Sequence, residues 1–199
     1  MTNSRRSSPG LSFLRQTGFT VMELLMGIAV LAILTTLAVP AFTQLLQNNR
    51  LDAQANEMVA SFQFARSEAV KRGSWVEICA SADGDSCGGD FSNGWIAHAD
   101  PATMVNPDEE NPLRVWSGPG DDLEFDAQQT TARFLASGCF DHDQDNQRCS
   151  APDEQPFLKL SDSSENENIR PRLVQIALTG NVLGCREDKV TNGICEQPE

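Results

Sequence analysis

Six cysteines are the residues of this 199-residue chain whose type and spacing point first to a chemistry. They form three close pairs along the chain, with polar residues between the members of each pair: Cys79 and Cys87, Cys139 and Cys149, Cys185 and Cys195. Many connectivities are open to six cysteines. We favour the sequential one, in which each disulfide closes a polar loop and restricts the unfolded chain. A metal–thiolate site is the alternative, but there is no C-x-x-C spacing and neither histidine is grouped with the cysteines.

An acidic run offers a second chemistry. Residues 141–146 read DHDQDN, which matches the D-x-D-x-D beginning of a calcium loop, where carboxylate oxygens wrap a hard cation. The sixth position holds Asn146 rather than glycine, and the twelfth holds Pro152 rather than glutamate. A solvated acidic loop is therefore the favoured interpretation. Calcium stays as the alternative, with three candidate ligands: Asp141, Asp143 and Asp145. No other cofactor is expected.

The remaining reactive side chains predict no catalytic site. His98 falls in a predicted strand and His142 in the acidic run, and neither has a serine or cysteine partner in a local motif. The tryptophans Trp75, Trp95 and Trp116 are interpreted as core or half-buried strand residues rather than as ligand platforms. We therefore expect a protein that is not an enzyme.

A long apolar segment near the N-terminus is the element that would position the rest of the chain. Residues 1–18 carry three arginines and no acid, and between residues 19 and 49 the only charged side chain is Glu23. Residues 24–42 carry no charge and are long enough to cross the hydrocarbon core of a bilayer as a helix. Because a basic flank stays cytoplasmic, the C-terminal part is expected on the outer side of the membrane.

Three simpler interpretations of this segment stay open. It could be a cleaved secretory signal, to which Val39-Pro40-Ala41 loosely corresponds, a plain membrane anchor, or a buried core helix. None of them explains an acid near the start of an otherwise apolar run. A carboxylate in lipid is costly, so Glu23 is taken as a functional residue.

The helix is predicted to continue beyond the apolar run. Pro40 removes one helical hydrogen bond and is expected to kink or loosen the helix. Lys71 and Arg72 favour a helix end, and Gly73 is a good stop. Between these points apolar residues recur at helical spacing on one face: Leu51, Ala55, Met58, Phe62, Ala65 and Ala69. We expect this stripe to pack on the C-terminal domain, while the first half of the helix stays free for lipid or for other subunits.

After Gly73 the sequence changes to short β-rich runs separated by polar and acidic loops. This alternation predicts a β-rich domain packed on the helix stripe, an α+β arrangement. The candidate strands are residues 75–80, 95–99, 113–116, 123–125, 131–135, 157–160 and 173–178.

The start of the apolar segment carries a recognisable motif. The residues Gly18-Phe19-Thr20-Val21-Met22-Glu23-Leu24-Leu25 resemble the class III signal of type IV prepilins. The resemblance implies cleavage after Gly18 by a prepilin peptidase and N-methylation of Phe19. Glu23 then stands at the fifth mature position, where the family has its signature acid. Its implied role is assembly, because a carboxylate in lipid needs a cation and the N-terminal amine of a neighbouring subunit supplies one.

The end of the predicted helix narrows the resemblance. Residues 65–73 read ARSEAVKRG, similar to the A-R-S-E-A-[IV]-K-R-G run that ends the long helix of FimT/GspH-type minor pilins. A cysteine-containing strand at 76–79 and a G-W-I strand ending at Asp100 follow in the same order. The resemblance covers residues 18–100, resumes at 173–185, and implies a pilin-like fold with a long N-terminal helix on a β-rich domain.

The charge balance argues against direct DNA binding. The chain has 15 Lys and Arg against 28 Asp and Glu, a formal net charge of −13, and so lacks a basic footprint. DNA-binding members of this family carry G-R-x-R before a cysteine in the C-terminal strand. Here residues 180–185 read GNVLGC, so Asn181 and Leu183 replace both arginines and little is left to neutralise phosphate.

These patterns divide the chain into three expected parts. Residues 1–18 form a leader peptide, and residues 19–73 a long helix that spans the membrane over 19–46 and is amphipathic over 47–73. Residues 74–199 form a disulfide-stabilised β-rich domain in the periplasm or on a filament surface.

The predicted function is that of a minor pilin of a type IV pilus, which joins the filament or its initiating or tip complex. A minor pseudopilin of a type II secretion system and a DNA-binding pilin for DNA uptake are the alternatives. The expected partners are the major pilin and other minor pilins, through the helix, together with a prepilin peptidase/N-methyltransferase. The protein is expected to cross the inner membrane once and then to enter a cell-surface pilus or a periplasmic pseudopilus.

Overall fold

The computed structural model describes residues 18–101, 112–120, 123–127, 129–144, 148–150, 158–163, 169–191, 194 and 195. The predicted leader therefore lies outside the described residues except for Gly18. The chain forms two compact units, Met1–Phe42 and Thr43–Glu199.

The first element is the helix α1, Val21–Arg72, which begins and ends where the sequence supplies caps. Thr20 acts as N-cap, because its side-chain Oγ1 accepts a hydrogen bond from the backbone N–H of Glu23 at 3.2 Å. At the other end Gly73 adopts φ +69°, the left-handed conformation that favours glycine after a helix, and its N–H donates to the Ala69 carbonyl. Pro40 lies inside α1, which continues on both sides of it.

The second half of α1 supplies one wall of the core. All six residues of the predicted stripe are buried, which confirms the helical spacing: Leu51, Ala55, Met58, Phe62, Ala65 and Ala69. Ser61 is also fully buried, and its hydroxyl donates to the Met58 carbonyl, so its polarity is satisfied within the helix.

The β-rich part of the second unit contains two main antiparallel sheets. The five-stranded sheet has the order β3-β2-β1-β5-β6, and the four-stranded sheet has the order β4-β7-β8-β9. The strands of the first are β1 Val76–Ala80, β2 Gly94–Ala99, β3 Arg114–Ser117, β5 Thr131–Phe134 and β6 Phe140–Asp141. Those of the second are β4 Leu123–Ala127, β7 Leu158–Asp162, β8 Arg172–Ile176 and β9 Val182–Arg186. A 3-10 turn, η2 Glu187–Lys189, and a two-stranded pair, β10 Val190–Thr191 with β11 Ile194–Cys195, follow.

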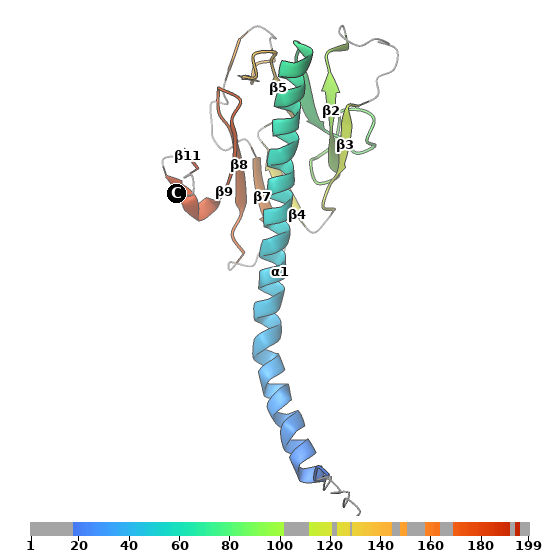
Figure 1. Cartoon of the computed structure of the whole chain (residues 1–199), viewed down its shortest axis with the longest axis vertical. Coiled ribbons are helices and arrows are strands. Elements are labelled where there is room, and N and C mark those ends of the chain that lie inside the picture. The colour runs from blue at the N-terminus through green and yellow to red at the C-terminus, as the bar shows by residue number, and fades with distance from the viewer. Residues whose placement is uncertain are drawn as a thin grey trace, which may run out of the picture. The chain divides into compact units, whose positions relative to one another are not determined.

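Both sheets pack against the second half of α1, as the ribbon in Figure 1 shows for the unit that begins at Thr43. Aromatic rings fill the space between them. Phe62 on α1 lies 6.4 Å from Phe134 on β5, and Trp95 on β2 stacks at 16° on Trp116 on β3. Trp95 and Trp116 are thus core residues as predicted, whereas Trp75 is half-buried under the guanidinium of Arg133, 4.4 Å from its ring.

Every predicted strand has a counterpart within two residues at each end. β9 was indicated only by the family resemblance at residues 180–185, and the sequence did not indicate β6, β10 or β11. β9 is an edge strand in which Val182 is the one buried residue, and Gly184 lies in it, so its sequence lacks an alternation of apolar and polar residues. The other three are two-residue strands, too short for any periodicity.

Candidate functional site

The residues of the predicted processing site lie at the exposed beginning of α1. Gly18 and Phe19 precede the helix, and the Phe19 side chain is 85 % exposed. Apart from the chain neighbours of Gly18, no atom of the described residues lies within 4 Å of the position that a Cβ on Gly18 would occupy. Residues 1–17, with the arginines of the leader, lie outside the described part of the chain.

Glu23 is placed by the helix cap. Thr20 and Glu23 are the first and fourth residues of a T-x-x-E capping sequence, so the bond from the Glu23 N–H to Thr20 Oγ1 fixes the backbone that carries the acid. The Glu23 side chain is exposed, in the first turn of α1. A carboxylate at a helix N-terminus is favoured by the helix dipole.

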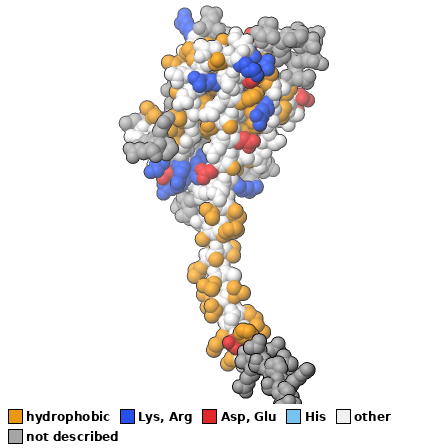
Figure 2. Space-filling model, in the orientation of Figure 1, with side chains coloured by type: hydrophobic (Ala, Val, Ile, Leu, Met, Phe, Trp, Pro, Cys, Tyr) orange, Lys and Arg blue, Asp and Glu red, His pale blue; other side chains and the backbone are white. Residues whose placement is uncertain are grey.

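The helix around Glu23 is apolar and exposed. α1 is the one helix among the described residues that is long and apolar enough to span a membrane, and none of its most apolar window is buried. Large side chains are exposed on all its faces, as the near-consecutive residues Met22, Leu24, Leu25 and Met26 show, and Figure 2 shows the hydrophobic surface in orange. A soluble protein rarely exposes such a surface, which marks a membrane-contacting or protein-contacting segment.

The six cysteines form three disulfides in sequence order: Cys79–Cys87, Cys139–Cys149 and Cys185–Cys195. The first joins the end of β1 to the loop that follows it, the second joins the residue before β6 to the loop after β6, and the third joins β9 to β11. The first disulfide therefore tethers an irregular segment to the larger sheet, and the third tethers the short pair β10–β11 to the smaller sheet.

The expectation that no histidine is grouped with the cysteines is wrong. The structure places His98 Nε2 at 2.9 Å from Cys87 Sγ and 3.2 Å from Cys79 Sγ. The sequence concealed this contact because it depends on strand register. Glu77 pairs with His98 across β1 and β2, so Cys79, two residues further along β1, lies diagonal to His98 on the same face.

The acidic run is only partly the solvated loop that the sequence suggested. Asp141 is buried at 1 % exposure in β6, opposite Arg133 of β5 in the strand register, while Asp143 is exposed. The Asp143 N–H donates to Ser150 Oγ at 2.9 Å. Asp145, the third candidate calcium ligand, lies outside the described residues.

The other histidine also lies on the five-stranded sheet. His142 follows β6, and its Nε2 lies 3.4 Å from the side-chain nitrogen of Gln129. Its backbone N–H donates to the Ser150 carbonyl at 3.4 Å. Within the described part of the chain its ring makes no hydrogen bond to a serine hydroxyl or a cysteine sulfur, so no nucleophilic triad is formed there.

The strand that replaces the DNA-binding motif is β9. Asn181 precedes it and is exposed, and Leu183 lies half-buried opposite Gln175 of β8. Three nearby cations are paired with carboxylates, which reduces the positive potential there: Arg170–Asp188 at 2.7 Å, Lys159–Glu187 at 2.9 Å and Arg186–Asp188 at 3.5 Å.

Arg66 is a structural residue that sequence reasoning missed. From α1 its Nε donates to the Gly138 carbonyl at 2.7 Å, and its Nη2 donates to the Thr179 carbonyl at 3.2 Å. These carbonyls belong to the turns between β5 and β6 and between β8 and β9, so one guanidinium joins the two sheets. The available signal was an arginine next to the buried Ala65 within the ARSEAVKRG run.

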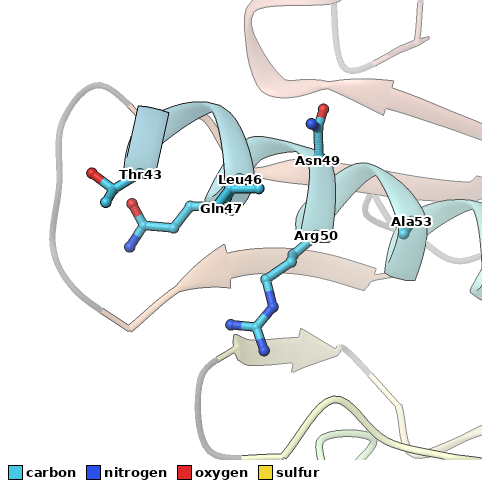
Figure 3. Close-up of a pocket in the computed structure, with 6 residues that line it drawn as sticks. All are labelled: Thr43, Leu46, Gln47, Asn49, Arg50 and Ala53. Carbon is cyan, nitrogen blue, oxygen red and sulfur yellow. The ribbon is translucent and has the colours of Figure 1, made fainter. Parts of the chain in front are cut away.

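A shallow groove lies on α1 itself, near the start of the second unit. Its lining residues are Thr43, Leu46, Gln47, Asn49, Arg50 and Ala53, and Figure 3 shows Asn49 and Arg50 extending to opposite sides of the helix. The lining contains no carboxylate, histidine or thiol, so this groove offers no general acid, base or metal ligand.

Comparison with known proteins finds one matching family and similar solved structures. The family described as Type II transport protein GspH matches residues 54–180. Among solved structures, the type IV minor pilin FimU of Pseudomonas aeruginosa (strain PAO1) is similar in its P21 crystal form, with 20 % identity and a TM-score of 0.50, over 73 % of this chain and 95 % of FimU. Its P65 form gives 19 % identity and a TM-score of 0.48 over 71 % and 98 % of the two chains.

No curated protein compared with the chain matches it. At these identities the likeness to FimU concerns the fold, one long N-terminal helix packed on an antiparallel β-rich domain. The family match, in contrast, spans more than half of the chain. The chain therefore belongs to the GspH family, described as Type II transport protein GspH, and has the fold of the type IV minor pilin FimU.

Proposed function

We propose that the chain is a minor pilin of a type IV pilus, cut after Gly18 by a prepilin peptidase, N-methylated at Phe19, and inserted into the filament or its initiating or tip complex. The observation that carries the proposal is the exposed apolar start of α1, with one carboxylate, directly after Gly18-Phe19 and in the same chain as a GspH-family domain. Before assembly this segment would anchor the protein in the inner membrane, with the β-rich domain in the periplasm.

Glu23 would select and align the partner. Cleavage after Gly18 creates a positively charged amine on Phe19 of every subunit. Glu23, one helical turn further, offers the opposite charge in an environment where an unpaired carboxylate is costly. An amine of an adjacent pilin that meets Glu23 removes this cost, so the pairing favours one axial register between neighbouring helices.

The experiment follows processing and incorporation separately, in the natural host. Mass spectrometry of the mature protein should find methylated Phe19 as the first residue. The Glu23→Gln variant should be processed at the same bond, yet be depleted from filaments sheared off the cells by about tenfold or more. The matched control is Glu57→Gln, an exposed glutamate in the second half of the same helix, which should enter filaments normally.

Two results would contradict this proposal. A mature N-terminus at Phe42 would identify a conventional signal peptide. Equal recovery of the Glu23 and Glu57 variants in sheared filaments would remove the assembly role of Glu23.

A type II secretion pseudopilus is the second candidate, because the description of the matched family names type II transport. Deletion of the gene separates the two systems. Loss of surface filaments with normal enzyme secretion supports the pilus, and the reverse result supports the pseudopilus. DNA uptake is disfavoured by the paired cations around β9.

A further inference from the structure

One cluster of reactive side chains has no place in the proposed assembly role. The sulfurs of Cys79 and Cys87 and the Nε2 atom of His98 converge within 4.8 Å of one another. Among the described residues this is the one place where three potential soft-metal ligands meet. In the structure the two sulfurs are joined as a disulfide, so the metal-binding atoms are thiolates only after reduction.

We propose that reduction of the Cys79–Cys87 disulfide converts this cluster into a zinc site, with two thiolates and His98 Nε2 as ligands and water in the fourth position. A set of two sulfurs and one imidazole nitrogen suits a borderline-soft d10 ion, and three protein ligands with one open position is a known zinc arrangement. The inference is independent of the filament role proposed above.

The first argument is geometric. A tetrahedral zinc site requires about 3.8 Å between two ligand sulfurs and about 3.6 Å between sulfur and nitrogen. His98 Nε2 already lies 2.9 Å and 3.2 Å from the two sulfurs, so the ring would retreat by less than about 1 Å. The Cα atoms of the two cysteines are 5.5 Å apart, a separation that leaves room for their side chains to turn toward one ion.

The second argument is that two of the ligands are fixed by the sheet. Cys79 on β1 and His98 on β2 lie on the side of the sheet that faces away from the core, because their neighbours Ile78 and Ala97 belong to the core cluster. The five-residue register between β1 and β2 holds this pair in place without any help from the disulfide.

The third argument concerns Cys87, which is held by its loop rather than by the disulfide alone. The Gly88 N–H donates to the Ala80 carbonyl at 2.8 Å, directly beside the disulfide. Asp83 Oδ1 accepts bonds from the N–H groups of Asp85 and Ser86, both at 2.9 Å, and Asp83 Oδ2 accepts a bond from Ser86 Oγ at 2.7 Å. These bonds persist when the S–S bond opens, so Cys87 Sγ stays beside the other two ligands.

Exposure decides how the site is opened. Cys79 is fully buried whereas Cys87 is exposed, so a dithiol reductant would attack Cys87 Sγ and release Cys79 as a thiolate. The second thiol of the reductant then resolves the mixed disulfide and frees Cys87, while the reductant becomes a disulfide. Two electrons and two protons pass to the protein in this exchange. Zinc binding afterwards displaces the two thiol protons to solvent.

The test uses the full chain in detergent micelles, treated with a small dithiol until alkylation and mass spectrometry show that Cys79 and Cys87 are free thiols. Zinc affinity is then measured by competition with a chromophoric chelator in three proteins: the unchanged chain, His98→Gln and the matched control His142→Gln. The control removes the other histidine, which lies on the same sheet but contacts no cysteine among the described residues.

We expect one zinc ion to bind after reduction and none before it, with at least a tenfold loss of affinity for His98→Gln and no loss for His142→Gln. X-ray absorption at the zinc edge should show two sulfur and one nitrogen ligands. This readout also separates the site from the thiols of the other two disulfides, which would give sulfur-rich coordination. Equal zinc affinity of the two histidine variants, sulfur-only coordination, or the absence of zinc binding after reduction would each overturn the proposal.

Discussion

The junction held by Arg66 makes a quantitative prediction at Gly180. Gly180 has φ +74°, and a Cβ placed on it would lie 2.0 Å from the Gly138 carbonyl oxygen and 2.9 Å from Arg66 Nε. Both neighbours are fixed, because Gly138 belongs to a backbone turn and the Arg66 guanidinium is hydrogen-bonded to it. A methyl group at this position therefore requires the two turns to separate by more than about 1 Å, since carbon–oxygen contacts are normally above about 3.2 Å.

The expected cost has two parts. A left-handed conformation costs a non-glycine residue about 1–2 kcal/mol. Separating the turns also weakens the two bonds from Arg66 to main-chain carbonyls, each worth about 1 kcal/mol for a partly exposed cation. We expect Gly180→Ala to lower the free energy of unfolding by about 3–4 kcal/mol.

The matched control is Gly73→Ala. Gly73 has nearly the same φ, +69°, but no atom lies within 4 Å of its virtual Cβ. Gly73→Ala should lower the free energy of unfolding only by the cost of the left-handed conformation, about 1–2 kcal/mol. Urea unfolding of the full chain in detergent, followed by the fluorescence of the buried tryptophans, measures both variants. If Gly180→Ala were no more destabilising than Gly73→Ala, the close approach of the two turns would not exist in solution.

Two further predictions concern charged groups of the second unit. Arg133→Met should lower the free energy of unfolding by about 2–3 kcal/mol, because Glu77, whose side chain is 13 % exposed, would lose the guanidinium that lies 2.7 Å away. Lys159→Met removes one partner of an exposed ion pair and should change the free energy of unfolding by less than about 0.5 kcal/mol. Equal effects of the two variants in urea unfolding would contradict this ranking. Hydrogen bonds from Ser86 and Asp85 hold the pKa of Asp83 well below its ordinary value of 3.8. The Asp83 carboxylate should therefore stabilise the loop fully above pH 3.8, and this stabilisation should be lost only as the pH falls through the lower, folded-state pKa. An NMR titration of the Asp83 carboxyl carbon with a midpoint at or above 3.8 would refute this prediction.

The helix and most of the sheet could be predicted because their signals are local. The apolar stripe between Leu51 and Ala69 repeats with the helical period, and Gly73 marks its end. The longer strands carry enough apolar and β-branched residues to be recognised. β6, β10 and β11 could not be found, since two-residue strands are created by their neighbours rather than by their own sequence.

The candidate sites also divide into those formed by neighbours in sequence, which could be predicted, and those formed by long-range contacts, which could not. Gly18, Phe19 and Glu23 are adjacent in sequence, so a motif sufficed to indicate them. The cluster of His98 with the disulfide joins residues 11 and 19 positions apart, and Arg66 reaches carbonyls 72 and 113 positions away. Contacts of this kind depend on register and packing, which one sequence without its fold does not reveal.

The order of strands in the larger sheet has a consequence for how the domain is built. β1 is the central strand, and it is also the first strand to be synthesised after α1, only a few residues behind the core stripe. The sheet can then grow outward in the order of synthesis, with β2 and β3 added to one edge and β5 and β6 to the other. No late strand has to insert between two that are already paired, so the large sheet can be completed before the last strands of the smaller sheet become available for pairing.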